Sequence, residues 1–152
     1  MATPKLTQLR QDIKDHLVTN TSLNDDQIII IRDKNAWDTI TSAVSLATNG
    51  LAVHISESSG QNSNLEQVGN RKYDVNMVIT IFSNYNLPDS LDNEEIVFEE
   101  LVLAMNTFAT KLFGNSQICI AGATLLSWTN IPNDFEYYAR AMTYQFPIVF
   151  NS

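Results

Sequence analysis

Apolar residues recur at helical spacing in three stretches, and the first of them begins the chain. In ATPKLTQLRQDIKDHLVTN (2–20) the apolar side chains are three or four residues apart, which places them on one face of an α-helix. Thr3 can cap this helix and Pro4 suits its first position, whereas Arg10 lies off the apolar face. The apolar face consists of Leu6, Leu9, Ile13 and Leu17.

Two later stretches show the same period. NAWDTITSAVSLATNG (35–50) predicts a helix that Asn35 caps and Asn49-Gly50 ends, with Trp37, Ile40, Val44 and Ala47 on its apolar face. The third stretch starts near Asp89 or Ser90 with several acidic residues, which favour the positive end of the helix dipole, and it stops at Gly114-Asn115. Its broad apolar face comprises Ile96, Phe98, Leu101, Val102, Met105, Phe108, Ala109 and Leu112.

Alternation of apolar and polar residues predicts the strands. Four isoleucines, Ile28–Ile31, suit a short buried strand, and LAVHISES (51–58) and RKYDVNMVITIF (71–82) alternate clearly. Two further strands are expected over 125–130 and 135–149, and Pro147 indicates that the last one is an edge or is near its end there. The strand over 71–82 is about twice the usual five or six residues.

A polar segment separates the two alternating strands. If these strands pair, residues 58–70 form the tip of a hairpin, although most hairpin loops have only about two to five residues. Leu65 and Val68 are isolated apolar positions in it, and Arg71-Lys72 at its base is the only adjacent basic pair of the chain. Two interpretations remain open: a segment that becomes ordered on a neighbouring subunit, or a mobile loop in solvent.

The order of these elements predicts the fold class. Helix, short strand, helix, strand, long strand, helix, strand, strand corresponds to an α+β fold: a mainly antiparallel sheet with helices packed on one face and a long hairpin arm. The chain has 152 residues and shows neither an internal repeat nor a linker, so residues 1–152 are expected to form a single domain.

The composition limits the classes of molecule that this chain is expected to bind. The formal net charge is −8, and after Lys72 only Lys111 and Arg140 are basic, so the basic stripe of an ordinary nucleic-acid-binding protein is missing. The single cysteine, Cys119, excludes an intrachain disulfide. We find neither a secretory signal nor an apolar run of about 18 residues, and we expect a cytoplasmic product without a membrane partner.

Candidate chemistry is sparse. His16 and His54 are far apart and form no spaced metal set, so each is interpreted as a structural residue. The aromatic residues, among them Trp37 and Trp128, favour core packing and subunit contacts over a ligand cage. We therefore predict no enzyme activity, no cofactor, and neither a catalytic nor a metal site.

The acidic cluster around Glu94 is the strongest remaining candidate. Glu95 and Glu99 share one helix face, and paired carboxylates can serve acid–base chemistry or divalent metals. A solvated helix start is the simpler interpretation; contact with a basic patch of a neighbouring subunit is the next. The candidate subunit-interface residues are Leu65, Val68, Arg71, Lys72, Glu94, Glu95 and Glu99.

The element order also resembles a known family. The first helix, the long hairpin, the helix in EEIVFEELVLAMNTFATKLFG and the closing strands in TLLSWTNIPNDFEYYARAMTYQFPIVF are similar to the tail terminator, or tail-completion, proteins of tailed bacteriophages. The resemblance covers most of residues 1–150 and implies a non-enzymatic virion protein of the tail or neck, formed in the host cytoplasm. Such proteins form a hexameric ring that caps the tail tube, ends its polymerisation and joins the head connector.

The resemblance also implies the partners. They are copies of the chain itself, the tail-tube protein and the head–tail connector protein, while DNA passes an acidic lumen without specific binding. Three alternatives remain: another connector or tube-like subunit, an adaptor of a contractile injection system, and a metal-dependent enzyme that uses the glutamate cluster.

Overall fold

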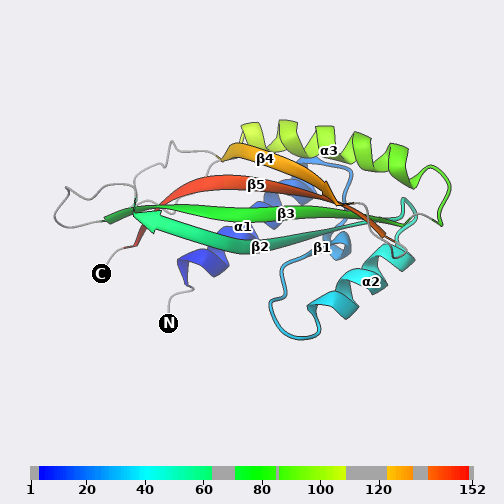
Figure 1. The fold of residues 1–152 in the computed structure, drawn as a ribbon, viewed down its shortest axis with the longest axis horizontal. Helices are drawn as coiled ribbons and strands as arrows, with labels where there is room; N and C mark the ends of the chain where they lie inside the picture. The colour runs from blue at the N-terminus through cyan, green and yellow to red at the C-terminus, as the bar shows by residue number, and fades with distance from the viewer. Residues whose placement is uncertain (1–3, 63–70, 85, 109–122, 132–136, 151–152) are drawn as a thin grey trace.

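Three helices and one five-stranded sheet make up the described part of the chain (Figure 1). The computed structural model describes residues 4–62, 71–84, 86–108, 123–131 and 137–150. The elements in chain order are α1 (Lys5–Asn20), η1 (Asp25–Gln27), β1 (Ile28–Ile29), α2 (Ala36–Leu46), β2 (Leu51–Asn62), β3 (Arg71–Asn84), α3 (Ser90–Asn106), β4 (Thr124–Ile131) and β5 (Tyr137–Phe150). None of the described helices is long and apolar enough to cross a membrane.

The sheet has the strand order β1-β2-β3-β5-β4 and is antiparallel except where β1 joins it. The pairs β2–β3, β3–β5 and β5–β4 are antiparallel, and β1 pairs parallel to β2 at only two positions. The α+β fold with a mainly antiparallel sheet is therefore confirmed. β2 and β3 form the expected long hairpin, and β5 accompanies β3 along its whole length from Arg71 to Asn84.

One face of the sheet carries the main hydrophobic core. Alternate residues of β2, β3 and β5 point to this face and meet the apolar faces of α1 and α3. Every second residue of β3 from Val75 to Ile81 is at most 3% exposed, and the α1 residues Leu9, Ile13 and Leu17 are fully buried. Burying such aliphatic side chains stabilises the fold by about 1.5–3 kcal/mol each, which makes this face the main source of stability.

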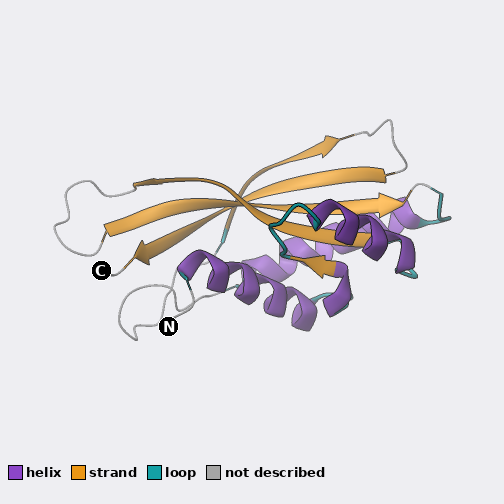
Figure 2. Cartoon of the chain, turned by 90° about the horizontal axis from the view of Figure 1, so that it is seen from below, coloured by secondary structure: helices purple, strands orange, loops and turns teal. Residues whose placement is uncertain are grey.

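The helix α2 packs on the opposite face, at one end of the sheet. Its buried residues Ile40 and Val44 contact Ile29 and Ala52, and Phe82 packs against the same cluster. In β2, Ala52 alternates with Leu51 and Val53, which belong to the main core, so α2 and the pair α1 and α3 lie on different faces. Figure 2 shows the twisted sheet with the helices gathered along its lower side and end.

Several predicted details of the helices are wrong. Arg10 is not off the apolar face in solvent but is 2% exposed, because α1 is covered on more than its predicted stripe. The predicted apolar face of α2 includes Trp37, yet this side chain is 48% exposed and its ring contacts Phe82 edge-to-face. The helix α1 begins at Lys5 with Pro4 as its N-cap, and Thr3 lies outside the described residues.

The third helix also differs from its prediction. It ends at Asn106, with Thr107 as its C-cap, so it stops before the expected Gly114-Asn115, which lies outside the described residues. Ile96, which the periodicity predicts on the apolar face, is 57% exposed, whereas Glu94 is buried. The buried face of α3 therefore differs from the predicted one and consists of Ser90, Glu94, Val97, Leu101, Ala104 and Met105.

The polar segment after β2 is shorter than expected. β2 continues to Asn62, pairing Ser59 through Asn62 with β3 after a bulge between Glu57 and Ser59. The predicted loop of residues 58–70 is wrong over its first five residues, since backbone pairing with an adjacent strand does not need apolar side chains. Pro147 agrees with its prediction: β5 pairs with β4 only up to Gln145, so Pro147 lies beyond this ladder.

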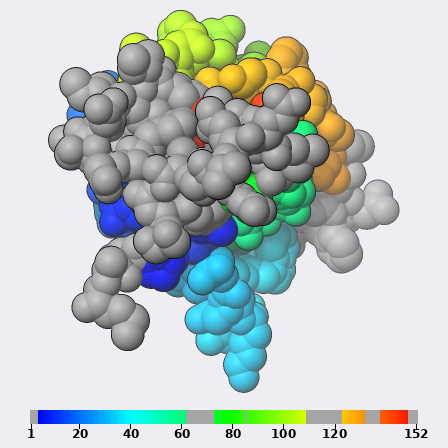
Figure 3. Space-filling view, turned by 90° about the vertical axis from the view of Figure 1, so that its left-hand side faces the viewer, coloured from blue at the N-terminus to red at the C-terminus, as the bar shows by residue number. Residues whose placement is uncertain are grey.

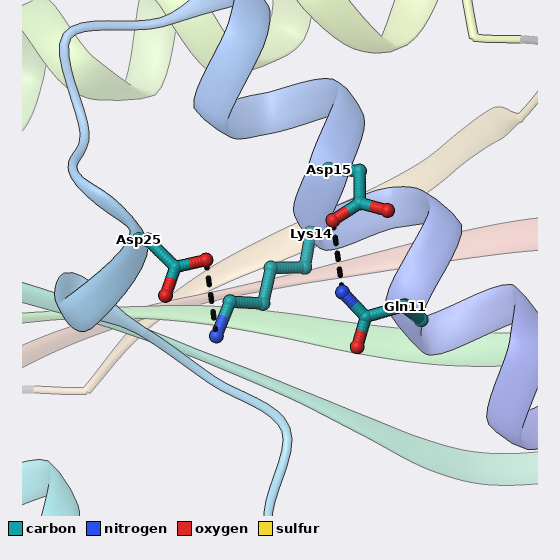
Figure 4. A network of polar contacts seen from close by, with 4 residues as sticks. All are labelled: Gln11, Lys14, Asp15 and Asp25. Carbon is teal, nitrogen blue, oxygen red and sulfur yellow. Dashed lines mark hydrogen bonds and ion pairs between the residues drawn. The ribbon is translucent and has the colours of Figure 1, made fainter.

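Polar contacts tie α1 to the segment that follows it. Lys14 Nζ lies 3.6 Å from Asp25 Oδ1 of η1, and Gln11 Nε2 donates to Asp15 Oδ1 at 2.8 Å along the helix (Figure 4). The loop after α1 is also held to α3, because Glu100 accepts hydrogen bonds from the backbone and hydroxyl of Ser22. The connection between β1 and α2, light blue in Figure 3, projects from the body of the molecule.

Candidate interaction surface

The strand β4 is the most exposed regular element of the sheet. It is the last strand in the described sheet and pairs only with β5. Leu126, Trp128 and Ile131 are 47–52% exposed, and its sequence TLLSWTNI contains no charged residue. Edge strands of stable monomers are commonly guarded by lysine, proline or a covering loop, because an open edge can pair with another chain. The side chains of β4 provide no such charge or proline.

The large residue of this edge is held from behind by α3. Trp128 contacts Phe98 edge-to-face, with ring centroids 5.4 Å apart, and the Arg140 guanidinium lies 4.3 Å from the Phe98 ring centroid. A tryptophan supported in this way presents a rigid apolar surface, which is the type of residue that most often dominates protein–protein contacts. The fixed indole therefore makes this edge a candidate interaction surface.

Arg140 is itself fixed by a buried ion pair. Its Nη2 lies 2.9 Å from Glu94 Oε1, and the side chains of Arg140 and Glu94 are 12% and 1% exposed. Burial raises the pKa of Glu94, and the charge and hydrogen bond of Arg140 offset this only in part. Glu94 Oε2 and Arg140 Nε have no hydrogen-bond partner, so the pair is incompletely satisfied. It joins α3 to β5 directly behind the Phe98–Trp128 contact.

At the opposite margin of the described sheet, β2 is paired over only part of its length. β1 pairs with β2 only at Val53 and His54, so no described strand pairs with the outer side of β2 from Ile55 to Asn62. A groove of about 450 Å³ lies along this margin, with Ser56 and Glu57 on the β2 side. The other lining residues are Ile31, Arg32, Asp33, Ala36 and His54.

The histidine at this groove has a structural explanation. Burial lowers the pKa of His54, and its Nε2 lies 3.4 Å from the Ile31 carbonyl oxygen, which limits that effect. His16 Nε2 donates to the carbonyl oxygen of Ala104 at 2.7 Å and its ring meets Phe108, so it ties α1 to the end of α3. Among the residues that the structure describes, no group of three or more His, Cys, Asp or Glu side chains could hold a metal ion.

The predicted interface residues fall into separate groups. Leu65 and Val68 lie outside the described residues. Arg71 and Lys72 begin β3, where they pair with Phe150 and Val149. Arg140, the partner of Glu94, pairs with Ile81, which is ten residues further along β3 than Arg71 and about 33 Å away at ~3.3 Å per residue. The basic pair and the glutamates of one chain are thus far apart.

The glutamates also differ among themselves. Glu95 and Glu99 are exposed on α3, as a solvated helix start requires. For Glu94, the prediction of a solvated carboxylate is wrong, because its side chain is buried against Arg140. For the same reason it is not available to a neighbouring subunit, so its prediction as an interface residue is wrong as well. Sequence periodicity could not identify this, since a glutamate becomes buried only when its partner arrives from a strand far along the chain.

Sequence reasoning missed β4 as a surface. The sequence predicts core packing or subunit contacts for Trp128 and an ordinary sheet strand over 125–130. One signal was present: eight residues without any charge, in a chain of net charge −8, that carry four large apolar side chains at positions on both faces.

Comparison with known proteins gives no further assignment. No known protein-family model matches the chain, and no curated protein matches it.

Proposed function

We propose that this chain is a structural subunit that assembles with copies of itself into a ring and, as the resemblance implies, caps the tail tube of a tailed bacteriophage. The observation that carries the proposal is the uncharged, exposed edge strand β4 with its anchored Trp128. A strand of this kind on a chain of net charge −8 is suited to bind another protein rather than to remain in solvent.

The rest of the surface supports the same proposal. α3 presents the acidic residues Asp92, Glu95 and Glu99 to solvent, next to the exposed apolar residues Ile96 and Leu103. An acidic rim suits a ring through which DNA passes, because like charge prevents adhesion. Apolar residues between the acidic ones suit stacking on a tube or connector subunit.

Electron microscopy of particles that lack this protein tests the proposal. We expect tails of abnormal length that are not joined to heads, and restoration of normal particles when the purified protein is added. Tails of normal length joined to heads in its absence contradict the terminator function. Labelled protein located elsewhere in the particle favours a connector or tube-like role instead. If the genes that flank the gene for this chain are not phage genes, an adaptor of a contractile injection system is favoured.

A metal-dependent enzyme is the remaining alternative from a different class. It requires Glu95, Glu99 or Glu100 to gather around an ion. However, Glu100 already accepts a hydrogen bond from Ser22, and Glu94 forms an ion pair with Arg140. Its test is the melting temperature with and without divalent cations. A rise that Glu95→Gln and Glu99→Gln abolish favours the enzyme over the structural role.

A further inference from the structure

We infer that β4 of one copy adds antiparallel to the open margin of β2, from Ile55 to Asn62, in the next copy. The sheets of successive subunits then join into one continuous sheet around the ring. This inference rests on the proposed function, since it requires self-assembly, and it specifies which surfaces of the chain carry that assembly.

The first argument comes from strand direction. β2 is antiparallel to β3, β3 to β5, and β5 to β4, so β2 and β4 run in opposite directions within one chain. Rotation about an axis parallel to the strands leaves strand direction unchanged. Neighbouring copies in such a ring therefore bring β4 and β2 together as an antiparallel pair, which suits the sheet that each copy already has.

The second argument comes from the two margins. β4 has eight residues, and the open part of β2, 55–62, has eight as well. Because the two margins are different surfaces on opposite sides of one sheet (Figure 1), their pairing is a head-to-tail contact that can close into a ring. The groove beside Ser56 and Glu57 leaves room at the margin where β1 ends.

The third argument is electrostatic. Copies of a chain with net charge −8 repel one another, so they associate most readily through surfaces without charge. β4 has no charged residue, and the open part of β2, ISESSGQN, has only Glu57, while the groove beside it adds Arg32 and Asp33, whose opposite charges cancel. The two margins therefore meet without bringing several carboxylates together.

The backbone ladders also give a register. Across the sheet, Ser56 of β2 pairs with Val78 of β3, Val78 pairs with Thr143 of β5, and Thr143 pairs with Ser127 of β4. Without tilt between subunits, Ser127 of one copy thus lies beside Ser56 of the next. If the strands are tilted, as in closed barrels, the residue of β2 opposite Ser127 changes in steps of two, because only every second residue points to the same face of the sheet. Beyond the bulge in β2, the next such positions are Ser59 and Gln61.

Disulfide cross-linking between different single-cysteine variants tests the inference. Cys119 is first replaced by serine; Ser127→Cys is then mixed with Ser56→Cys, Ser59→Cys or Gln61→Cys and oxidised. Opposed positions of paired strands are close enough for a disulfide. We expect cross-linked dimers in one of these mixtures, none with Ser127→Cys alone, and none when Ser127→Cys is mixed with Ser42→Cys on the exposed side of α2.

Each other outcome overturns the inference in a distinguishable way. Cross-linking of Ser127→Cys to itself shows a two-fold β4–β4 contact instead of a head-to-tail one. Oligomers in native mass spectrometry without any β2–β4 cross-link show that other surfaces assemble, and the proposed function survives. A chain that stays monomeric with and without tail tubes contradicts both. Ser127 and Ser59 are exposed, and circular dichroism of each variant confirms that it folds.

Discussion

At the scale of single residues, backbone conformation decides where β2 can begin. Gly50 has φ +71°, and a Cβ on it would lie 2.7 Å from Leu87 Cδ2 and 3.3 Å from Ser90 Cβ. A left-handed residue without a side chain is therefore required where the chain turns from α2 into β2 beside the start of α3.

The two described glycines give a matched pair of substitutions. We expect Gly50→Ala to lower the free energy of unfolding by about 1–3 kcal/mol, because it adds both backbone strain and a close contact. Gly60→Ala is the control, since its Cβ would have only ordinary contacts of 3.7 and 3.8 Å within β2. Urea denaturation measures both; equal losses for the two variants would contradict this explanation of Gly50.

The buried pair of Glu94 and Arg140 has a defined pH dependence. The pKa of Glu94 is raised above its ordinary value of 4.5 mainly by burial, so the folded state binds this proton more tightly than the unfolded state does. This contribution to stability is fully present below about pH 4.5 and is lost as the pH rises through the folded pKa.

Glu94→Gln isolates that contribution. We expect the free energy of unfolding of the natural chain, minus that of Glu94→Gln, to fall as the pH rises from 4 toward 8, because only the natural chain must then hold a buried carboxylate. Denaturation at a series of pH values measures the difference, in which the other carboxyl groups cancel. A difference that grows with pH would mean that attraction to Arg140 outweighs burial.

At the scale of elements, the strand β4 separates what stabilises a monomer from what joins copies. Its side chains are mostly exposed, so they contribute little to the hydrophobic core, whereas its pairing with β5 completes the sheet. A change on its solvent side should therefore affect assembly more than folding.

Thr129→Lys tests this separation. Thr129 is exposed on β4, and a lysine at an edge strand discourages strand addition. We expect self-association to weaken at least about tenfold, equivalent to ~1.4 kcal/mol, with an unchanged melting temperature of the monomer. Ser42→Lys on α2 makes the same change in net charge away from the margins and should leave association unaffected; analytical ultracentrifugation compares the two.

Element prediction succeeded where a single period covered a whole element. The apolar face of α1 and the alternation in β3 were both correct, because burial on one side leaves a regular trace in the sequence. It failed where polar segments become ordered by pairing alone, as at Ser59–Asn62 of β2, and where exposed and buried positions mix, as at Ile96 of α3.

At the scale of the whole molecule, two hypotheses for assembly differ in their response to salt. Pairing of β4 with the β2 margin is opposed by the net charge of −8 on each copy, and salt screens that repulsion, with a Debye length of about 8 Å at physiological ionic strength. Docking of Arg71 and Lys72 onto Glu95 and Glu99 of a neighbour is an attraction that salt weakens.

We therefore expect the association constant to rise with sodium chloride concentration. Light scattering or ultracentrifugation over a range of salt concentrations measures it, with the Thr129→Lys variant as the reference for loss of the β4 contact. An association constant that falls with salt supports the charged contact between copies, and Glu95→Lys with Glu99→Lys should then abolish it.

The amino-acid sequence by itself determined the periodic features: the apolar faces of helices, the alternation of strands, the α+β class and the acidic surface. These depend on neighbours within a few residues, and local periodicity records them. The tertiary structure alone decided that Glu94 is buried against Arg140, that β4 is an exposed margin backed by Phe98, and that no described strand pairs with the outer side of β2 beyond His54. Each of these depends on which distant strand or helix becomes a neighbour, because burial and backbone pairing are properties of the assembled sheet and not of any one segment.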